Sequence, residues 1–498
     1  MPPPYQRLSP QDRTFLDLEG PSNPQHIGVV ALLDAAPLRT EPGGIDIDGI
    51  RRYIASRLHL LPRYRQRLAW IPLEGHPVWV DDPHFNVVFH VRHTGLPRPG
   101  DERQLKRLAG RLLSQPLDRG RPLWEMWVVE GLEGGDRLAL IQKVHHCMID
   151  GVGGVDLMTL LMSPEPLEEI EPAPPYEPEP VPGAVELLRW ELERRSRALL
   201  SAAASLPRRL RDPQTLLDRI HQGVVAVAET LGAGLRSTSD TPINGPLGPH
   251  RKFDWLPMDL ARLKAVKNAL GGTVNDVVLA TVAGALRRFL RLRRVDVDHL
   301  HLRANIPVSL RSRDERGTLG NRIALLMADL PVEEADPTRR LARVQETMGR
   351  LKRSKQALGA QVLAAVSEWT STTLLSLAVR VSTRGRPYNL VVTNVPGPQI
   401  PLYLLRARMR ACYPVVNLLP NQGLGVALFS YDGLLFWGCT ADWDQLPDLH
   451  EFVGAIEESL AELEAVLPGS RKARAGGARG RLSAGNAQTA QAERSSSM

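Results

Sequence analysis

The sequence predicts a mixed α/β protein, on two observations. Strand-like and helix-like segments alternate on both sides of a proline-rich stretch, and the composition is that of a globular protein. Apolar residues make up 43% of the 498 residues and charged residues 23%, which is typical of globular domains. A chain of this length has room for two to four domains of ~100–200 residues, or for one large fused fold. The composition therefore excludes a disordered or fibrous chain.

The region before residue 163 combines both periodicities. Apolar runs predict strands at 27–33, 78–80 and 87–91, and helical spacing predicts helices at 47–61 and 104–113. Two further strands, 127–132 and 137–144, flank Glu133-Gly134-Gly135-Asp136, which is a hairpin turn signal. The second strand of this hairpin leads directly into His145-His146.

A proline-rich stretch interrupts the pattern at residues 163–183, with eight prolines and six glutamates. Such a composition cannot sustain a helix or a sheet and predicts an extended linker. An arginine-rich helical region follows at 184–210, with an expected break near Pro207. We therefore divide the chain into an N-terminal subdomain (residues 1–162), a linker with basic helices (163–248), a C-terminal subdomain (249–467) and a disordered basic tail (468–498).

The C-terminal subdomain again combines helices and strands. Helices are predicted at 259–270, 274–290 and 449–467, and strands at 302–308, 323–330, 389–394, 425–430 and 434–439.

Charge and cysteine content exclude several classes of protein. The formal net charge is +7, but most of it lies in the tail after residue 470, so the folded region lacks the basic excess of a nucleic-acid-binding protein. Three dispersed cysteines form neither a disulfide framework nor a metal site, and indicate a reducing compartment. No apolar run is long enough for a spanning helix, and the N-terminus does not read as a secretory signal.

The segment from His145 to Gly151 carries the clearest chemistry. Histidine titrates near physiological pH and can act as a general base toward a hydroxyl. Asp150 could orient a ring or hold the loop, and Gly151 permits a close backbone approach. The histidine pair could also be half of a metal site or two structural histidines, and for the pair alone a structural role comes first. The complete HHxxxDG string after an apolar strand favours catalysis.

HHxxxDG resembles the signature of the coenzyme A-dependent acyltransferase superfamily, and other motifs resemble those of bacterial wax ester synthase/acyl-CoA:diacylglycerol acyltransferases. They cover about residues 5 to 467 in the same order. These motifs are Ser9-Pro10-Gln11-Asp12 with Phe15-Leu16 and His26-Ile27-Gly28, Pro122-Leu123-Trp124, Asn275-Asp276, Pro307-Val308-Ser309-Leu310-Arg311 with Gly320-Asn321, Asn394-Val395-Pro396-Gly397-Pro398, and Ser430-Tyr431-Asp432-Gly433.

The resemblance implies a fold and a mechanism. It implies two chloramphenicol-acetyltransferase-like subdomains with a substrate tunnel between them. His146 would be the general base, His145 would position it, and Asp150 and Gly151 would shape the loop. Asn275 would donate a hydrogen bond to the oxyanion, although Thr273, Asn275 and Asp276 also read as a helix cap. We expect no metal and no cofactor, since acyl-CoA is a substrate.

Three further motif residues are candidate substrate neighbours under the same resemblance. Ser309 and Arg311 end a predicted strand. The family resemblance implies that they are neighbours of the site. Trp124 joins Asn275 and Asp276 as a candidate for substrate binding, although a buried packing role for this indole is the simpler interpretation. Cys147 reads as a small packing residue rather than a nucleophile.

The expected function is long-chain acyl transfer from acyl-CoA to diacylglycerol, to a long-chain alcohol, or to both. The alternatives are another HHxxxDG acyltransferase acting on a different hydroxyl or amine, and a catalytically silent lipid-binding homologue. The substrates imply a cytoplasmic protein associated peripherally with the membrane or with lipid inclusions, and no nucleic acid partner. The region 184–210 is the candidate contact, with Trp190 and leucines for the acyl boundary and Arg194, Arg195 and Arg197 for headgroups.

Overall fold

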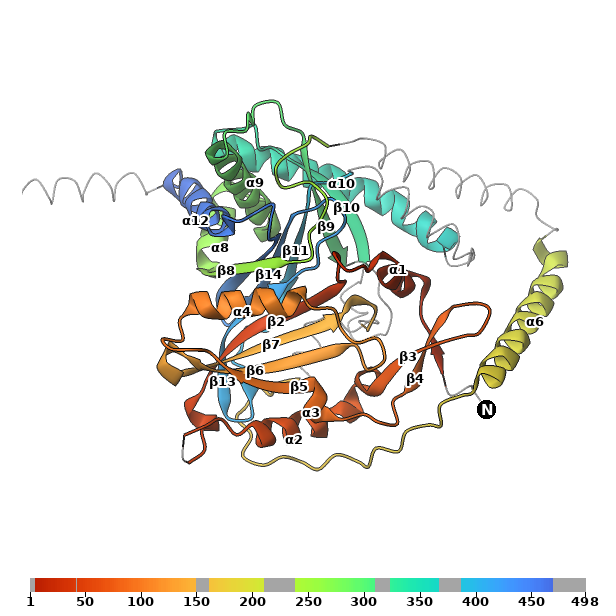
Figure 1. Ribbon diagram of the computed structural model, residues 1–498. Helices are drawn as coiled ribbons and strands as arrows, with labels where there is room; N and C mark the ends of the chain where they lie inside the picture. Colours follow the sequence, from red (N-terminus) through yellow and green to blue (C-terminus); the bar gives the residue numbers. More distant parts are fainter. Residues whose placement is uncertain are drawn as a thin grey trace, which may run out of the picture. The chain divides into compact units, whose positions relative to one another are not determined.

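The computed structural model describes residues 5–41, 43–148, 161–209, 238–309, 323–366 and 387–468 (Figure 1). They form two units: Met1–Met258, Leu302–Ala328 and Arg350–Leu449 make up the first, and Asp259–His301, Asp329–Gly349 and His450–Met498 the second. Helices and strands alternate along the chain, so the predicted mixed α/β class is confirmed. The domain boundaries and the substrate tunnel stay predictions.

A six-stranded sheet in the first unit carries the histidine motif (Figure 1). Its order is β12 (Tyr403–Leu404), β13 (Ala407–Val415), β2 (His26–Asp34), β7 (Arg137–His145), β6 (Trp124–Leu132) and β5 (Val91–Gly95). β6 and β7 form the predicted antiparallel hairpin. β2 pairs antiparallel with β7, and His26 lies directly opposite His145. At Gly28 of β2 an added Cβ would lie 2.0 Å from the Gln142 carbonyl oxygen, so only glycine fits there.

β13 comes from the C-terminal half of the chain but pairs with β2 of the N-terminal half. The pairing runs from Met409 opposite Leu33 to Val415 opposite Gly28. The two halves of the sequence therefore share one sheet.

A second sheet of six strands is built from residues after the linker. Its order is β10 (Ile323–Leu330), β9 (Leu302–Ser309), β11 (Leu390–Pro396), β14 (Leu424–Tyr431), β15 (Leu434–Asp442) and β8 (Arg251–Asp259). β11 runs parallel to both β9 and β14, whereas β14 and β15 form an antiparallel hairpin. Five of these strands were predicted, and β8 was not.

Helices of the first unit flank the histidine-bearing sheet. They are α1 (Pro10–Leu18), α2 (Ile47–Arg57), α3 (Val87–His90) and α4 (Glu102–Ser114). α4 begins with a capping box formed by Asp101 and Gln104, and its end accepts two hydrogen bonds from buried Lys143 of β7, at Leu112 O and Gln115 O. The predicted strand at 87–91 is wrong. The Asn86 side chain accepts the Val88 N–H and starts a short helix there.

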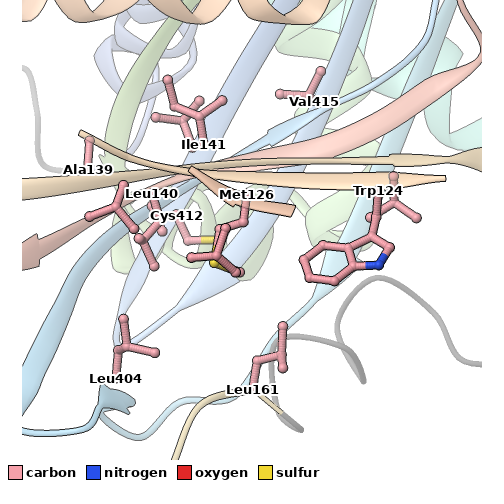
Figure 2. Close-up of a cluster of buried hydrophobic side chains, with 14 of the residues drawn as sticks. Trp124, Met126, Ala139, Leu140, Ile141, Leu161, Leu404, Cys412 and Val415 are labelled. Carbon is pink, nitrogen blue, oxygen red and sulfur yellow. The ribbon is translucent and has the colours of Figure 1, made fainter. Parts of the chain in front are cut away.

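The core between these elements is aliphatic and aromatic. Figure 2 shows side chains from β6 and β7 beside residues from segments far along the chain; those labelled are Trp124, Met126, Ala139, Leu140, Ile141, Leu161, Leu404, Cys412 and Val415. Among the polar residues of β7, Gln142 is buried with apolar neighbours such as Met126 and Leu140.

The proline-rich linker has neither a helix nor a regular strand from residue 164 to residue 183, as predicted. It is nevertheless attached to the first unit. Leu167 N–H donates to Leu405 O, and the Tyr176 hydroxyl lies within hydrogen-bond distance of Arg65 O and Asp82 O. α6 (Ala184–Arg209) follows and extends two residues past Pro207, so the expected break is not found there.

The second unit consists of helices with paired charges. They are α8 (Leu260–Leu270), α9 (Val274–Leu292), the first half of α10 (Pro337–Val366) and α12 (Leu449–Ala465). Glu462 of α12 binds Arg288 of α9, and at 2.7 Å also buried Arg340 of α10. In the described ranges no single helix is long and apolar enough to cross a membrane; only the bent pair of α8 and α9 taken together reaches that length and character.

Candidate active site

His145 is the last residue of β7 and is only 1% exposed. Its backbone N–H donates to Leu123 O at 2.9 Å, which connects the histidine motif to the Pro-Leu-Trp motif. Its Nδ1 accepts the Cys147 backbone N–H at 3.1 Å. A neutral imidazole that accepts at Nδ1 carries its proton on Nε2. This Nε2 lies 3.3 Å from Glu19 Oε1, so the ring is fixed in one orientation.

Glu19 contacts three basic side chains, those of His145, His26 and Arg119. It follows the last residue of α1, and its Oε1 also lies 3.5 Å from Nε2 of His26 on β2. Arg119 donates to its Oε2 from Nε and Nη2 at 2.9 and 2.5 Å. Burial raises the pKa of this carboxyl, but His145, His26 and Arg119 outweigh burial and hold the pKa well below its usual range. Glu19 is therefore a carboxylate that holds the two buried rings.

His146 has a different environment from His145. It begins a short 3₁₀ turn, His146–Met148, and its backbone N–H donates to Gln25 O at 2.8 Å. Its ring stacks on Phe15 of α1 with centroids 3.7 Å apart and planes 17° apart. Neither ring nitrogen is hydrogen-bonded to another residue in the described ranges of the chain. Burial and the nearby His145 lower the pKa of His146 to about 4, so its imidazole is neutral at physiological pH.

The two histidines therefore differ in what they can do. His145 has both ring nitrogens facing protein groups, whereas His146 is half-buried, uncharged and held in place by a ring stack. A neutral imidazole with an uncommitted nitrogen can accept a proton from a substrate hydroxyl. This difference supports the predicted division into a base and a positioning residue.

Cys147 is a buried thiol. Burial, together with the carboxylates of Asp12 and Glu19, raises its pKa well above the ordinary value. A thiol held neutral is a poor nucleophile, in agreement with the packing role predicted for it.

Trp124 belongs to the core at the start of β6. It is 1% exposed, and its indole N–H donates to Tyr64 O at 2.9 Å. Its ring stacks on His90, with centroids 4.6 Å apart. The packing interpretation fits these contacts, and a direct contact with substrate stays a prediction.

The remaining predicted site residues belong to the second unit, to β9 or to ranges outside the described residues. Asp276 caps α9 in the second unit, where its carboxylate accepts from Thr273 N–H and Oγ1 at 2.8 Å each. Asn275 is half-buried beside it, and its side chain has no hydrogen bond to the described residues. Ser309 ends β9, and its side chain is not described. Asp150, Gly151 and Arg311 lie outside the described residues, so their roles stay predictions.

Sequence reasoning missed the supporting role of the first motif. From the sequence alone, Phe15 and His26 are named only as members of a matching motif, and Glu19 is not named. The available signal was a carboxylate at the end of a short amphipathic helix, followed by a strand that begins with histidine. That pattern becomes informative only once β2 is known to pair with β7.

Known proteins share this fold. A trichothecene 15-O-acetyltransferase from Fusarium sporotrichioides is 11% identical, with a TM-score of 0.59 over 92% of this chain and 95% of that one. The starter condensation domain of rhizomide synthetase is 13% identical, with a TM-score of 0.54 over 93% and 96%. At these identities the likeness shows the fold alone, which is that of chloramphenicol-acetyltransferase-like enzymes.

Closer similarity defines the family. Residues 8–278 match the wax ester synthase/diacylglycerol acyltransferase catalytic domain, and residues 319–464 match the C-terminal domain of the same proteins. The chain therefore belongs to the wax ester synthase/diacylglycerol acyltransferase family and is an acyltransferase.

Individual relatives agree with this membership. A Mycobacterium tuberculosis protein provisionally named a diacylglycerol O-acyltransferase is 35% identical over 92% of this chain and 90% of its own length. The wax ester synthase/diacylglycerol acyltransferase from Marinobacter aquaeolei VT8 is 27% identical, with a TM-score of 0.64 over 92% of this chain and 99% of that one.

Replacing Glu19 should weaken the support under the histidines. We expect Glu19→Gln to lower the free energy of unfolding by about 1–3 kcal/mol, because a neutral amide replaces charge-assisted contacts to Arg119 and to buried rings. Turnover should fall as well, since His145 loses its fixed orientation. Denaturant unfolding and an acyl-transfer assay measure the two effects. Glu168→Gln, at an exposed carboxylate paired with Arg406, is the control, and equal behaviour of both variants would contradict this role.

Acidification should destabilise the protein through its buried histidines. Burial lowers the pKa of His26 to about 4, whereas an unfolded histidine titrates near 6.5. Between these values the unfolded chain binds a proton that the folded chain does not, so stability is complete above pH ~6.5 and falls toward pH ~4. We expect His26→Gln to reduce the slope of melting temperature against pH across this window. His450→Gln, at an exposed histidine, should leave it unchanged; an unaltered slope in His26→Gln would refute the assignment.

Proposed function

We propose that this protein transfers a long-chain acyl group from acyl-CoA to the hydroxyl of diacylglycerol, of a long-chain alcohol, or of both, with His146 as the general base. The observation that supports this most is the neutral, ring-stacked His146 beside a His145 whose nitrogens face protein groups. The acceptors are inferred from the names of the relatives, which include both diacylglycerol acyltransferases and a wax ester synthase.

The proposed step is a direct transfer. His146 takes the proton of the acceptor hydroxyl while the oxygen attacks the thioester carbonyl carbon. Hydrogen-bond donors then stabilise the oxyanion, and Asn275 is the candidate side chain. When the intermediate collapses, the C–S bond breaks, and the proton taken up by His146 passes to the departing sulfur, so that coenzyme A leaves as the thiol and His146 is neutral again. The neutral, buried Cys147 has no role in this scheme, and acyl-CoA enters as a substrate rather than as a cofactor.

An assay with purified protein and labelled palmitoyl-CoA tests this proposal. Diacylglycerol, hexadecanol and a long-chain amine serve as separate acceptors. Triacylglycerol or wax ester as the product supports the proposal, whereas amide formation alone would favour a different HHxxxDG acyltransferase. Tight binding of acyl-CoA without any product would indicate a silent lipid-binding homologue.

A further inference from the structure

A small lobe of the first unit joins the main hydrophobic core through Leu68 and Trp79. It consists of a three-stranded sheet, β1 (Gln6–Arg7), β4 (Pro77–Asp81) and β3 (Gln66–Trp70), together with α6. Ile71, Val78, Val80 and Leu187 of α6 form its own buried cluster. Trp190 of α6 lies against Tyr5, with ring centroids 5.6 Å apart. Leu187 and Trp190, two of the apolar residues predicted to face lipid, therefore contact the protein.

Ion pairs connect α6 to the turn between β3 and β4. Arg7 bridges Glu74 of the turn, at 2.8 Å, and Glu191 of α6, at 2.5 Å. Arg195 contacts both carboxylates, and Arg194 binds Glu191. The Glu191 side chain is only 3% exposed, whereas that of Arg195 is 54% exposed. In this cluster the guanidinium groups of Arg194 and Arg195 are exposed, whereas the carboxylate of Glu191 is buried.

The turn itself exposes apolar residues at an unfavourable position. Leu73 has a φ of +64° and is 95% exposed. A left-handed backbone favours Gly or Asn, and water favours a polar side chain, so both preferences argue against leucine here. Trp70, at the end of β3, is 45% exposed. Leu73 destabilises the isolated protein and makes no contact with its core. Such a residue suggests that another molecule contacts this turn.

Further exposed apolar residues lie on α6. Val185, Leu192 and Leu200 are exposed, and their spacing of seven and eight residues places them on a similar side of the helix. Arg189 and Arg197 are also exposed, and both pair with Glu193. Because successive residues are about 100° apart around a helix, these apolar side chains lie roughly opposite the face of α6 that meets the lobe through Leu187 and Glu191. They are therefore not part of the surface around Leu73.

We propose that Trp70, Leu73 and the outward Arg194 and Arg195 form one docking surface for an anionic lipid bilayer. The leucine and the indole enter the acyl boundary, and the guanidinium groups contact phosphate oxygens. The ion pairs of Arg7, Glu74 and Glu191 hold both elements in one lobe, so turn and helix engage together. This surface adds a partner to the proposed function and is independent of the acceptor used.

The test replaces Leu73 with asparagine in the full-length protein. Leu73→Asn suits the left-handed backbone, so the melting temperature should stay the same or rise. Flotation with phosphatidylcholine vesicles containing phosphatidylglycerol should show binding weakened about tenfold, as expected for losing one inserted leucine. Ile400→Asn, at an exposed apolar residue outside this lobe, is the matched control and should float like the wild type.

Two further measurements complete the test. Wild-type binding should fall with pure phosphatidylcholine vesicles and at high salt, because the cationic contribution is screened. Acyl transfer to detergent-dispersed acceptor should be unchanged in Leu73→Asn, which separates loss of docking from failure of the proposed function. Equal flotation of Leu73→Asn and wild type, or equal loss in Ile400→Asn, would overturn the proposal. Charge reversal of Arg194 or Arg195 is a poorer test, since it would also break the ion pairs to Glu191.

Discussion

His146→Ala should reduce acyl transfer by about 10²–10⁴-fold, the usual contribution of a positioned general base. The ring packs on Phe15 and its nitrogens make no hydrogen bond to other described residues, so its removal should affect the chemical step more than the fold. Steady-state rates with palmitoyl-CoA and the preferred acceptor measure the loss, and circular dichroism with thermal melting checks the fold.

Two neighbouring variants make the result specific. His145→Ala should reduce turnover less, because His145 acts through position, although loss of its contact with Glu19 should lower stability. Cys147→Ala, which keeps a small buried side chain, should retain most of the activity. Near-normal turnover in His146→Ala, or a larger loss in Cys147→Ala, would refute the proposed mechanism.

Trp124→Ala should destabilise the protein by about 3–5 kcal/mol, the usual cost of deleting a buried tryptophan. The side chain fills the space between His90 and Tyr64, and its removal also leaves the Tyr64 carbonyl without its indole donor. Denaturant unfolding measures this change directly.

A conservative variant separates packing from substrate binding. Trp124→Phe keeps an aromatic ring but loses the N–H, so it should cost less stability than alanine. If Trp124 only packs, KM of the folded variants should equal that of the wild type. A raised KM with unchanged unfolding would instead support the substrate contact implied by the family resemblance.

Local signals made much of the fold predictable. The β6–β7 hairpin combines two apolar runs with a glycine-containing turn, and α9 combines a capping pattern with a long apolar face. The error at residues 87–91 is also local, because a single Asn86 cap outweighs the strand propensity of the valines. The pairing of β13 with β2 could not be predicted, because it joins segments nearly 400 residues apart. Nothing in the sequence of either segment identifies the other as its partner.

The same distinction applies to the site. His145 and His146 follow one another in a recognisable string, so the sequence indicates them directly. Glu19, Phe15 and Arg119 reach the histidines only through strand pairing and helix packing, and each is an ordinary residue in its own segment. Supporting residues of this kind are defined by the fold, and the motif alone does not reveal them.

The strand shared between the two halves of the chain affects how the protein is made. During synthesis, β2 and β7 leave the ribosome long before β13, and at ~5–20 residues per second the delay is on the order of ten to fifty seconds. Throughout that time β2 presents an open edge, the kind of surface that recruits other chains. The nascent N-terminal sheet is therefore a natural client for chaperones that shield unpaired strands. It reaches its final form only when residues 407–415 arrive and occupy the edge.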